Sequence, residues 1–178
     1  MSHARFADRP TDPGIRGGLA IVTFSYHAAP ELVAGTDIPI YGTKAKERVD
    51  VAALRSWIEP HHPYHALIER AQAMPNQGAS SGFKYGRAVG AIEATVAACG
   101  IPFTILEPSV WKQFHRLRGD DKEVSRQRAP ELFPGAHRLF PHKKDHGRAE
   151  AALIALTAAT LSFPSVRETC RTYIRQTR

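Results

Sequence analysis

The stretch "YHALIERAQAMPNQGASSGFKYGRAVGAIEATVAACG" (64–100) combines a strand that ends in an acid, a loop and a long helix. "YHALIE" (64–69) is a short apolar run typical of a buried strand. "AMPNQGASSG" (73–82) is rich in Gly, Pro and Ser and is typical of a loop. "FKYGRAVGAIEATVAACG" (83–100) predicts a helix that its last glycine closes. A strand, a loop and a helix of this kind form a crossover unit of an α/β protein.

The rest of the chain extends this pattern on both sides. Asp50 is a candidate helix N-cap, Ser109 another, and Pro130 interrupts or ends a polar helix. The expected elements are strands at 4–11, 17–26, 36–42, 64–69 and 101–108, and helices at 49–60, 83–100, 109–117, 120–133, about 143–162 and 165–178. Short turns join the first three strands, which predicts an antiparallel meander, whereas helices separate the last two, which predicts parallel pairing. We therefore expect a mixed five-stranded sheet with helices on both faces.

Composition sets the class of protein and of partner. The chain has 178 residues, 43% hydrophobic and 23% charged, which fits one globular domain. Its formal net charge of +7 indicates an anionic partner such as nucleic acid, although a basic surface also serves solubility. Two cysteines, Cys99 and Cys170, are too few for a disulfide framework. No apolar run of about 18 residues or signal-peptide core occurs, so we expect no membrane association and a cytoplasmic or nucleoid-associated protein.

Five side chains of types that can bind metal ions fall near expected strand ends and at the start of a late helix. They are Asp12, Glu69, Asp145, His146 and Glu150. Open α/β sheets bind ligands at such an edge. Acids that converge there repel one another unless a cation lies between them, and oxygen ligands suit Mg²⁺ or Mn²⁺. The sequence therefore predicts a divalent metal site.

Two of these acids also have simpler explanations. Asp12 in "TDPG" is explained as a turn residue alone, since Asp-Pro-Gly favours turns. Glu69 ends an apolar strand, where a buried acid needs a partner, and the neighbouring Arg70 could be that partner. The metal-site hypothesis and these structural explanations stay open on the sequence alone.

The late helix has alternatives too. Asp145 is an N-cap, a metal ligand or both. His146 and Glu150 are four residues apart and share one face, as in a surface pair. However, "AALIALTAATL" (151–161) leaves little of this helix for solvent.

Taken together, these segments resemble the RuvC-type Holliday junction resolvases of the ribonuclease H-like superfamily, in particular the phage and chloroplast versions. Motifs from most of residues 11–160 carry the resemblance: "TDPGIRGGLAIV" (11–22), "LIERAQAMPNQGASSGFKYGRAVGAIEA" (67–94), "PSVWKQF" (108–114), "GDDKEVSRQRAPELFP" (119–134) and "KKDHGRAEAALIA" (143–155). The resemblance implies a ribonuclease H-like α/β fold over a single nuclease domain, residues 1–178, with a core of about 11–162 and a basic C-terminal helix at 165–178.

The resemblance also implies an activity, namely Mg²⁺-dependent hydrolysis of phosphodiester bonds in Holliday junctions during DNA recombination and repair. Two metal ions per site would be held by Asp12 with His146 and Glu150, and by Asp12 with Glu69, with Asp145 as a second choice beside His146. Mn²⁺ would be able to substitute. Two sites in a C₂ homodimer, joined through helix 83–99, would cut two opposed strands.

Basic side chains would support this chemistry. Lys112 and Lys122 would stabilise the charge that grows on the phosphate. The residues expected to contact DNA are Arg70, Gln72, Lys84, Arg87, Arg126, Arg128, Lys143, Lys144 and Arg148. Such contacts give salt-sensitive binding with little sequence information.

Two departures from the family pattern affect these expectations. The first strand has Arg9, Pro10 and Thr11 where the family has an apolar run. Gly147 stands three residues before Glu150, where the family often has an acid or a histidine, so the ligand shifts to His146. The alternatives are a nuclease of the same superfamily that acts on RNA–DNA hybrids or other branched DNA, and a catalytically dead protein that binds branched DNA.

Overall fold

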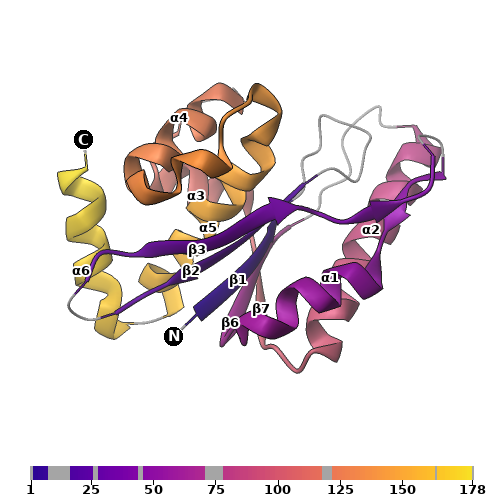
Figure 1. Ribbon diagram of the computed structural model, residues 1–178, viewed down its shortest axis with the longest axis horizontal. Helices are drawn as coiled ribbons and strands as arrows, with labels where there is room; N and C mark the ends of the chain where they lie inside the picture. The colour runs from indigo at the N-terminus through magenta and orange to yellow at the C-terminus, as the bar shows by residue number, and fades with distance from the viewer. Residues whose placement is uncertain are drawn as a thin grey trace.

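A mixed five-stranded sheet with the order β3-β2-β1-β6-β7 forms the centre of the molecule (Figure 1). The computed structural model describes residues 2–7, 17–25, 28–43, 46–70, 78–117, 122–162 and 164–177. The strands are β1 (Ser2–Ala7), β2 (Gly18–Thr23), β3 (Glu31–Asp37), β6 (His65–Glu69) and β7 (Phe103–Leu106). β1, β2 and β3 pair antiparallel, whereas β6 runs parallel to both β1 and β7.

One strand differs from the sequence expectation. Of the expected first strand, the structure describes the part up to Ala7 as β1, and residues 8–11 lie outside the described residues. The third strand is β3, not 36–42. Since Pro39 has no N–H for a ladder, the chain leaves the sheet there. Its next residues form β4 (Ile40–Tyr41), which pairs with β5 (Arg48–Val49) in a separate two-stranded ladder.

Helices α1 (Val51–Ile58) and α2 (Ala79–Ala98) cover one face of the sheet (Figure 1). The expected N-cap is confirmed, because Asp50 Oδ1 accepts a hydrogen bond from the backbone N–H of Ala53 at 3.0 Å. A 3₁₀ turn, η2 (Glu59–His61), follows α1. The core on this face consists of Leu19, Ile38, Val49, Leu54, Ile58, Ala66, Ile68, Ala88, Ile92, Val96 and Ile101.

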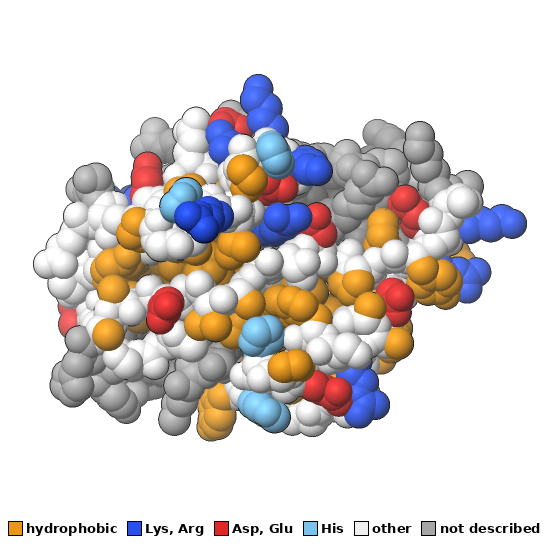
Figure 2. All heavy atoms as spheres, in the orientation of Figure 1, with side chains coloured by type: hydrophobic (Ala, Val, Ile, Leu, Met, Phe, Trp, Pro, Cys, Tyr) orange, Lys and Arg blue, Asp and Glu red, His pale blue; other side chains and the backbone are white. Residues whose placement is uncertain are grey.

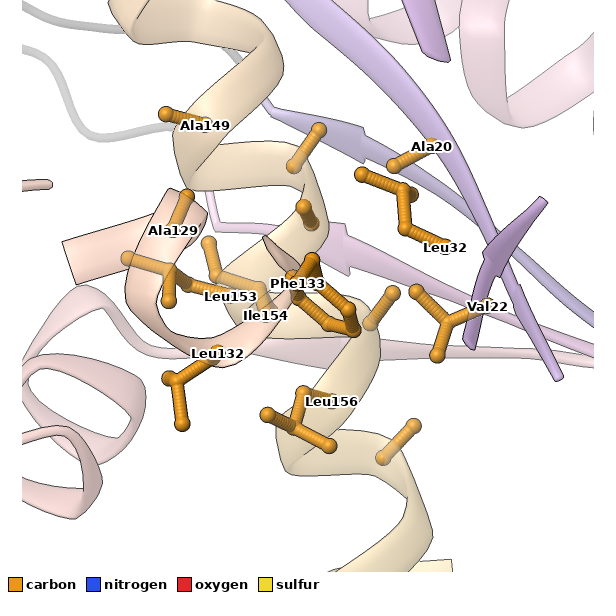
Figure 3. Close-up of a cluster of buried hydrophobic side chains, with 14 of the residues drawn as sticks. Ala20, Val22, Leu32, Ala129, Leu132, Phe133, Ala149, Leu153, Ile154 and Leu156 are labelled. Atoms are coloured by element: carbon orange, nitrogen blue, oxygen red, sulfur yellow. The ribbon is translucent and has the colours of Figure 1, made fainter. Parts of the chain in front are cut away.

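The second face carries the remaining helices. They are α3 (Pro108–Phe114), α4 (Lys122–Leu132), the 3₁₀ turns η3 (Pro134–Leu139) and η4 (Lys143–Asp145), α5 (His146–Ser162) and α6 (Pro164–Gln176). α5 lies against β1, β2, β3 and β6, and α4 and α6 pack on its other side. Figure 3 shows Phe133 and Leu132 of the α4 end meeting Leu153, Ile154 and Leu156 of α5. α5 is therefore a central helix between two layers.

Alternating residues of β2 show that both faces of the sheet are buried. Leu19 belongs to the core under α1 and α2, whereas Ala20 and Val22 belong to the core under α5. This is the period of two expected of a strand. Among the described helices, none combines the length and the apolar character that crossing a membrane requires. The expected α/β architecture with helices on both faces is confirmed.

Candidate active site

Glu69 ends β6 and is held by a tryptophan. The glutamate is 8% exposed, and its Oε1 accepts a hydrogen bond from Nε1–H of Trp111 in α3 at 2.7 Å. Trp111 is itself 1% exposed, so packing fixes the donor as well. A buried indole N–H and a buried carboxylate satisfy one another here. The structure thus orients this acid from a neighbouring element.

The sequence reasoning assigned the wrong partner to Glu69. Arg70 is exposed and forms an ion pair with Oε1 of Glu107. Alternation explains this result, because consecutive residues of a strand point to opposite faces. Ser109 was also expected to cap the next helix, but α3 begins one residue earlier with Pro108 at its first position and Glu107 as the N-cap.

Two further acids are buried at the start of α5. Glu150 is 2% exposed, and its Oε1 accepts a hydrogen bond from Oγ of Ser125 in α4 at 3.4 Å. Asp145, in the turn before α5, is 1% exposed. Its Oδ2 accepts a hydrogen bond from the backbone N–H of His142 at 2.8 Å, and Nη1 of Arg148 lies 3.9 Å from its Oδ1. Asp145 therefore closes the 3₁₀ turn that precedes α5.

His146, the first residue of α5, is half-buried. Its Nδ1 lies 3.2 Å from the carbonyl oxygen of Lys143, a contact that holds the ring beside the turn. His146 and Glu150 are one helical turn apart, as the sequence predicted, whereas Asp145 precedes the helix. The choice of His146 and Glu150 as a ligand pair stays a prediction.

The first turn of α5 crosses the start of β2 at glycine contacts. A Cβ atom added to Gly18 would lie 2.3 Å from the carbonyl carbon of Gly147, and one added to Gly147 would lie 3.1 Å from Gly17. Only glycine permits such a close approach of two backbones. The close contact between α5 and β2 explains why residue 147 is a glycine and not an acid or a histidine.

The donor set suits a hard divalent cation, because Glu69, Asp145 and Glu150 supply carboxylate oxygens from nearly buried positions. Among the residues that the structure describes, however, no group of three or more His, Cys, Asp or Glu side chains is arranged to hold a metal ion. The expected ligand Asp12 and the expected DNA contact Gln72 lie outside the described residues. The described residues are thus compatible with part of the expected ligand set.

Three of the arginines expected to contact DNA form hydrogen bonds within the protein. Arg126 donates to Glu123, Arg128 to Glu131 and to the carbonyl oxygen of Thr177 at 2.7 Å. Arg148 donates from Nε and Nη2 to the two carboxylate oxygens of Asp37 in β3, at 2.8 and 2.9 Å. These hydrogen bonds raise the pKa of Arg148 and tie α5 to the edge of the sheet. The structure gives all three arginines an intramolecular role.

The other basic residues lie closer to solvent. Arg70, Arg87, Lys143 and Lys144 are exposed, and Lys84 and Lys112 are half-buried. Figure 2 shows Lys, Arg and His side chains gathered on the upper part of the molecule, over the segment between α4 and α5. The backbone of Lys122 starts α4, and its side chain is not among those described.

The order of the five-stranded sheet and the helices on both of its faces define an α/β protein. The chain is similar in structure to RuvC of Thermus thermophilus, with a TM-score of 0.65 to RuvC in complex with a Holliday junction substrate and 0.64 to a second RuvC structure. In both comparisons identity is 22%, and the match covers 89% of this chain and 93% of the other. No family model and no curated protein matches the sequence. The comparisons thus establish the RuvC fold.

Proposed function

We propose that this chain is a structure-specific endonuclease that resolves four-way DNA junctions by Mg²⁺-dependent hydrolysis. The proposal depends above all on the burial of Glu69 and Glu150. These two acids come from different elements, β6 and α5, and both are nearly fully buried, and carboxylate oxygens are the ligands that Mg²⁺ prefers. The likeness to a RuvC fold that has been solved with a Holliday junction supports the choice of substrate.

In this proposal, Asp12, His146 and Glu150 would hold one Mg²⁺ ion, Asp12 and Glu69 would hold a second, and Asp145 would be the alternative to His146. Mn²⁺ would be an acceptable substitute. Bound ions of this kind lower the pKa of a water molecule and neutralise charge on the leaving oxygen. Trp111 fixes the orientation of Glu69, and Ser125 that of Glu150, so both acids are positioned before the substrate arrives.

The basic side chains provide the electrostatic part of the mechanism. Lys112 and Lys122 are proposed to stabilise the phosphate as its charge grows. We assign the contacts with flanking phosphates chiefly to Arg87, Lys84, Lys143 and Lys144, since Arg70 pairs with Glu107 and Arg126, Arg128 and Arg148 also have internal partners. Contacts of this type steer the protein to DNA and weaken with salt.

We also propose that two copies assemble through α2. A Cβ added to Gly82, Gly86 or Gly90 would meet no atom within 4 Å, and these residues recur every four positions along the helix. Phe83 beside them is 67% exposed. A second chain would cover this face and would place one site on each of the two opposed strands of a junction. A monomer by light scattering at micromolar concentration, with and without junction DNA, would contradict this assembly.

The test is cleavage of a synthetic four-way junction with and without Mg²⁺, by wild type and by Glu69→Gln and Asp12→Asn. We expect symmetric nicks by wild type, none without metal, and at least a thousandfold loss in each variant with retained junction binding. Panels with a replication fork, a flap and an RNA–DNA hybrid separate junction resolution from a related nuclease activity. A wild-type protein that binds junctions and cuts none of these substrates would identify a binding protein instead.

A further inference from the structure

A hollow of about 490 Å³ opens where the end of α3 meets the last turns of α6, and none of the described buried acids lines it. Arg116, Arg128, Arg171 and Arg175 line it together with the apolar side chains Phe114 and Ile174. A concave surface with four cations and two apolar walls is suited to an anion that carries an apolar or aromatic group.

Among the described residues, little compensates the positive charge of this hollow. Arg128 is neutralised by Glu131, and its guanidinium donates to the carbonyl oxygens of Thr177 and Ile174, so it anchors the end of α6. Arg116, Arg171 and Arg175 are exposed, and none of their guanidinium groups bonds to another described side chain. No acidic side chain is among the described residues that line the hollow. Three cations therefore face one opening.

Arg116 holds a backbone conformation that arginine rarely adopts. Its φ is +56°, and the N–H groups of Arg116 and Leu117 donate to the carbonyls of Gln113 and Lys112. The same pattern ends α2, where Gly100 has φ +70° and the following N–H bonds to Val96. Glycine is the usual residue at this position because it lacks a Cβ atom. An arginine there sacrifices stability, which indicates that its side chain serves another purpose.

The hollow is connected to the candidate active site through rigid elements. Arg116 follows Trp111, the donor to Glu69, by just over one helical turn. His115 between them is 4% exposed, and its Nε2 lies 2.6 Å from the carbonyl oxygen of Leu153 in α5. Leu153 lies about 5 Å along α5 from Glu150 at 1.5 Å per residue. The hollow and the two buried acids are thus joined through α3 and α5.

We propose that this hollow binds a backbone phosphate of the DNA outside the cleavage site, with Arg116, Arg171 and Arg175 as its ligands. The inference rests on the proposed function, since it extends the path of the same DNA. Phe114 and Ile174 would pack against the sugar or base attached to that phosphate. Guanidinium groups suit a phosphate ester because of their planar array of donors.

The test is binding of a fluorescent four-way junction, without Mg²⁺, at several salt concentrations. We expect Arg171→Gln/Arg175→Gln to bind roughly tenfold more weakly and to lower the slope of log K against log salt by about 2, close to one for each phosphate contact. The control Arg55→Gln/Arg167→Gln removes the same charge from outside the hollow and should leave both quantities close to wild type. Equal losses in the two double variants would overturn the proposal.

Arg116→Gly separates binding from folding. We expect an unchanged or higher melting temperature, because glycine relieves the left-handed conformation, together with about threefold weaker junction binding. Wild-type affinity for the junction in this variant would contradict a role of Arg116 in phosphate binding. If the hollow variants bind and cut junctions like wild type, the hollow does not bind DNA and the proposed function still stands. If wild type neither binds nor cuts junctions, the proposed function is wrong.

A free anion is the other possible source of the phosphate, and pyrophosphate tests it by calorimetry. Pyrophosphate that binds wild type, is lost in Arg171→Gln/Arg175→Gln and competes with junction DNA would support the proposal. Pyrophosphate that binds in the same arginine-dependent way without competing would show that the hollow takes a soluble anion and would overturn the assignment to DNA.

Discussion

Helices α5 and α2 lie on opposite faces of the same sheet and differ in how much of each is covered. Along α5, every residue from Ala149 to Leu156 is buried, because the sheet covers one side and α4 and α6 the other. Along α2, Tyr85, Ala88, Ile92 and Val96 form one buried stripe, whereas the glycine side faces open space. α5 is thus fixed by packing on all sides, and α2 keeps one side open.

This difference in packing fits the roles that we propose for the two helices. Buried acids at the start of α5 need a rigid support, since a shift of about 1 Å in a reacting group reduces catalysis strongly. An open glycine-lined face on α2 instead permits another backbone to approach. The difference predicts that substitutions along the α5 contact disturb the fold, while those on the open side of α2 disturb only association.

The largest effect is expected where α5 crosses β2. Gly18→Ala would place a Cβ atom 2.3 Å from backbone atoms of Gly147, and neither backbone can move without opening the core. We expect a loss of about 3 kcal/mol or more in the free energy of unfolding, measured by urea denaturation. Gly90→Ala is the matched control and should stabilise the helix by roughly 0.5–1 kcal/mol. Similar changes in the two variants would remove the distinction between the two helices.

The next effect concerns the support of the site. Trp111→Phe keeps an aromatic ring but removes the N–H that binds Glu69. We expect a cost of about 1–3 kcal/mol, because a buried carboxylate loses a donor. Cleavage of a junction should fall by roughly tenfold or more, because an acid that is no longer held in place is a poorer catalyst. Trp57→Phe on α1, the other tryptophan of the chain, is the control and should cut at the wild-type rate.

The elements that could be predicted from sequence are those with a local signal. Asp50 caps α1 and Gly100 closes α2 with a positive φ, as expected, because both effects involve only neighbouring residues. The error at 36–42 came from an apolar pattern that continued past Pro39, where the ladder cannot. Local chemistry therefore identified most elements, and pairing across the sheet decided the rest.

The site was less predictable because its contacts are distant in sequence. Glu69 and Trp111 are 42 residues apart, and Ser125 and Glu150 are 25 apart, so no local pattern links them. One signal was available: a buried tryptophan needs an acceptor for its N–H, and "PSVWKQF" is apolar enough to bury Trp111. The reason for a glycine at position 147 could not be predicted from the sequence, because the side chain is excluded by the close approach to Gly18, which is distant in sequence.

A smaller effect is expected on the open side of α2. Gly86→Leu adds a large side chain where the chain itself offers no contact within 4 Å. We expect an unchanged or higher melting temperature, because leucine favours a helix more than glycine does. If α2 joins two copies, the dimer should dissociate at least tenfold more readily, as light scattering over a dilution series would show. A dimer that survives this substitution would place the interface elsewhere.

The reactivity of the two cysteines measures the difference in packing between α5 and α2 in the unmodified protein. Cys170 belongs to the core beside α5 and is 2% exposed, and burial raises the pKa of its thiol to about 11. Cys99 ends α2 and is only half-buried, although burial raises the pKa of this thiol too. At pH 8 we expect an alkylating reagent to modify Cys99 at least tenfold faster than Cys170, as measured by mass spectrometry of the native protein.

The control is Cys99→Ser, in which the remaining thiol of Cys170 should react slowly until denaturant is added. The rate at Cys170 should rise about tenfold from pH 8 to pH 9, because well below its pKa a thiol gains thiolate tenfold per pH unit, and the rate at Cys99 should rise as well. Equal native rates would mean that the α5 side opens as readily as the end of α2, and would contradict the rigid support inferred for the acids.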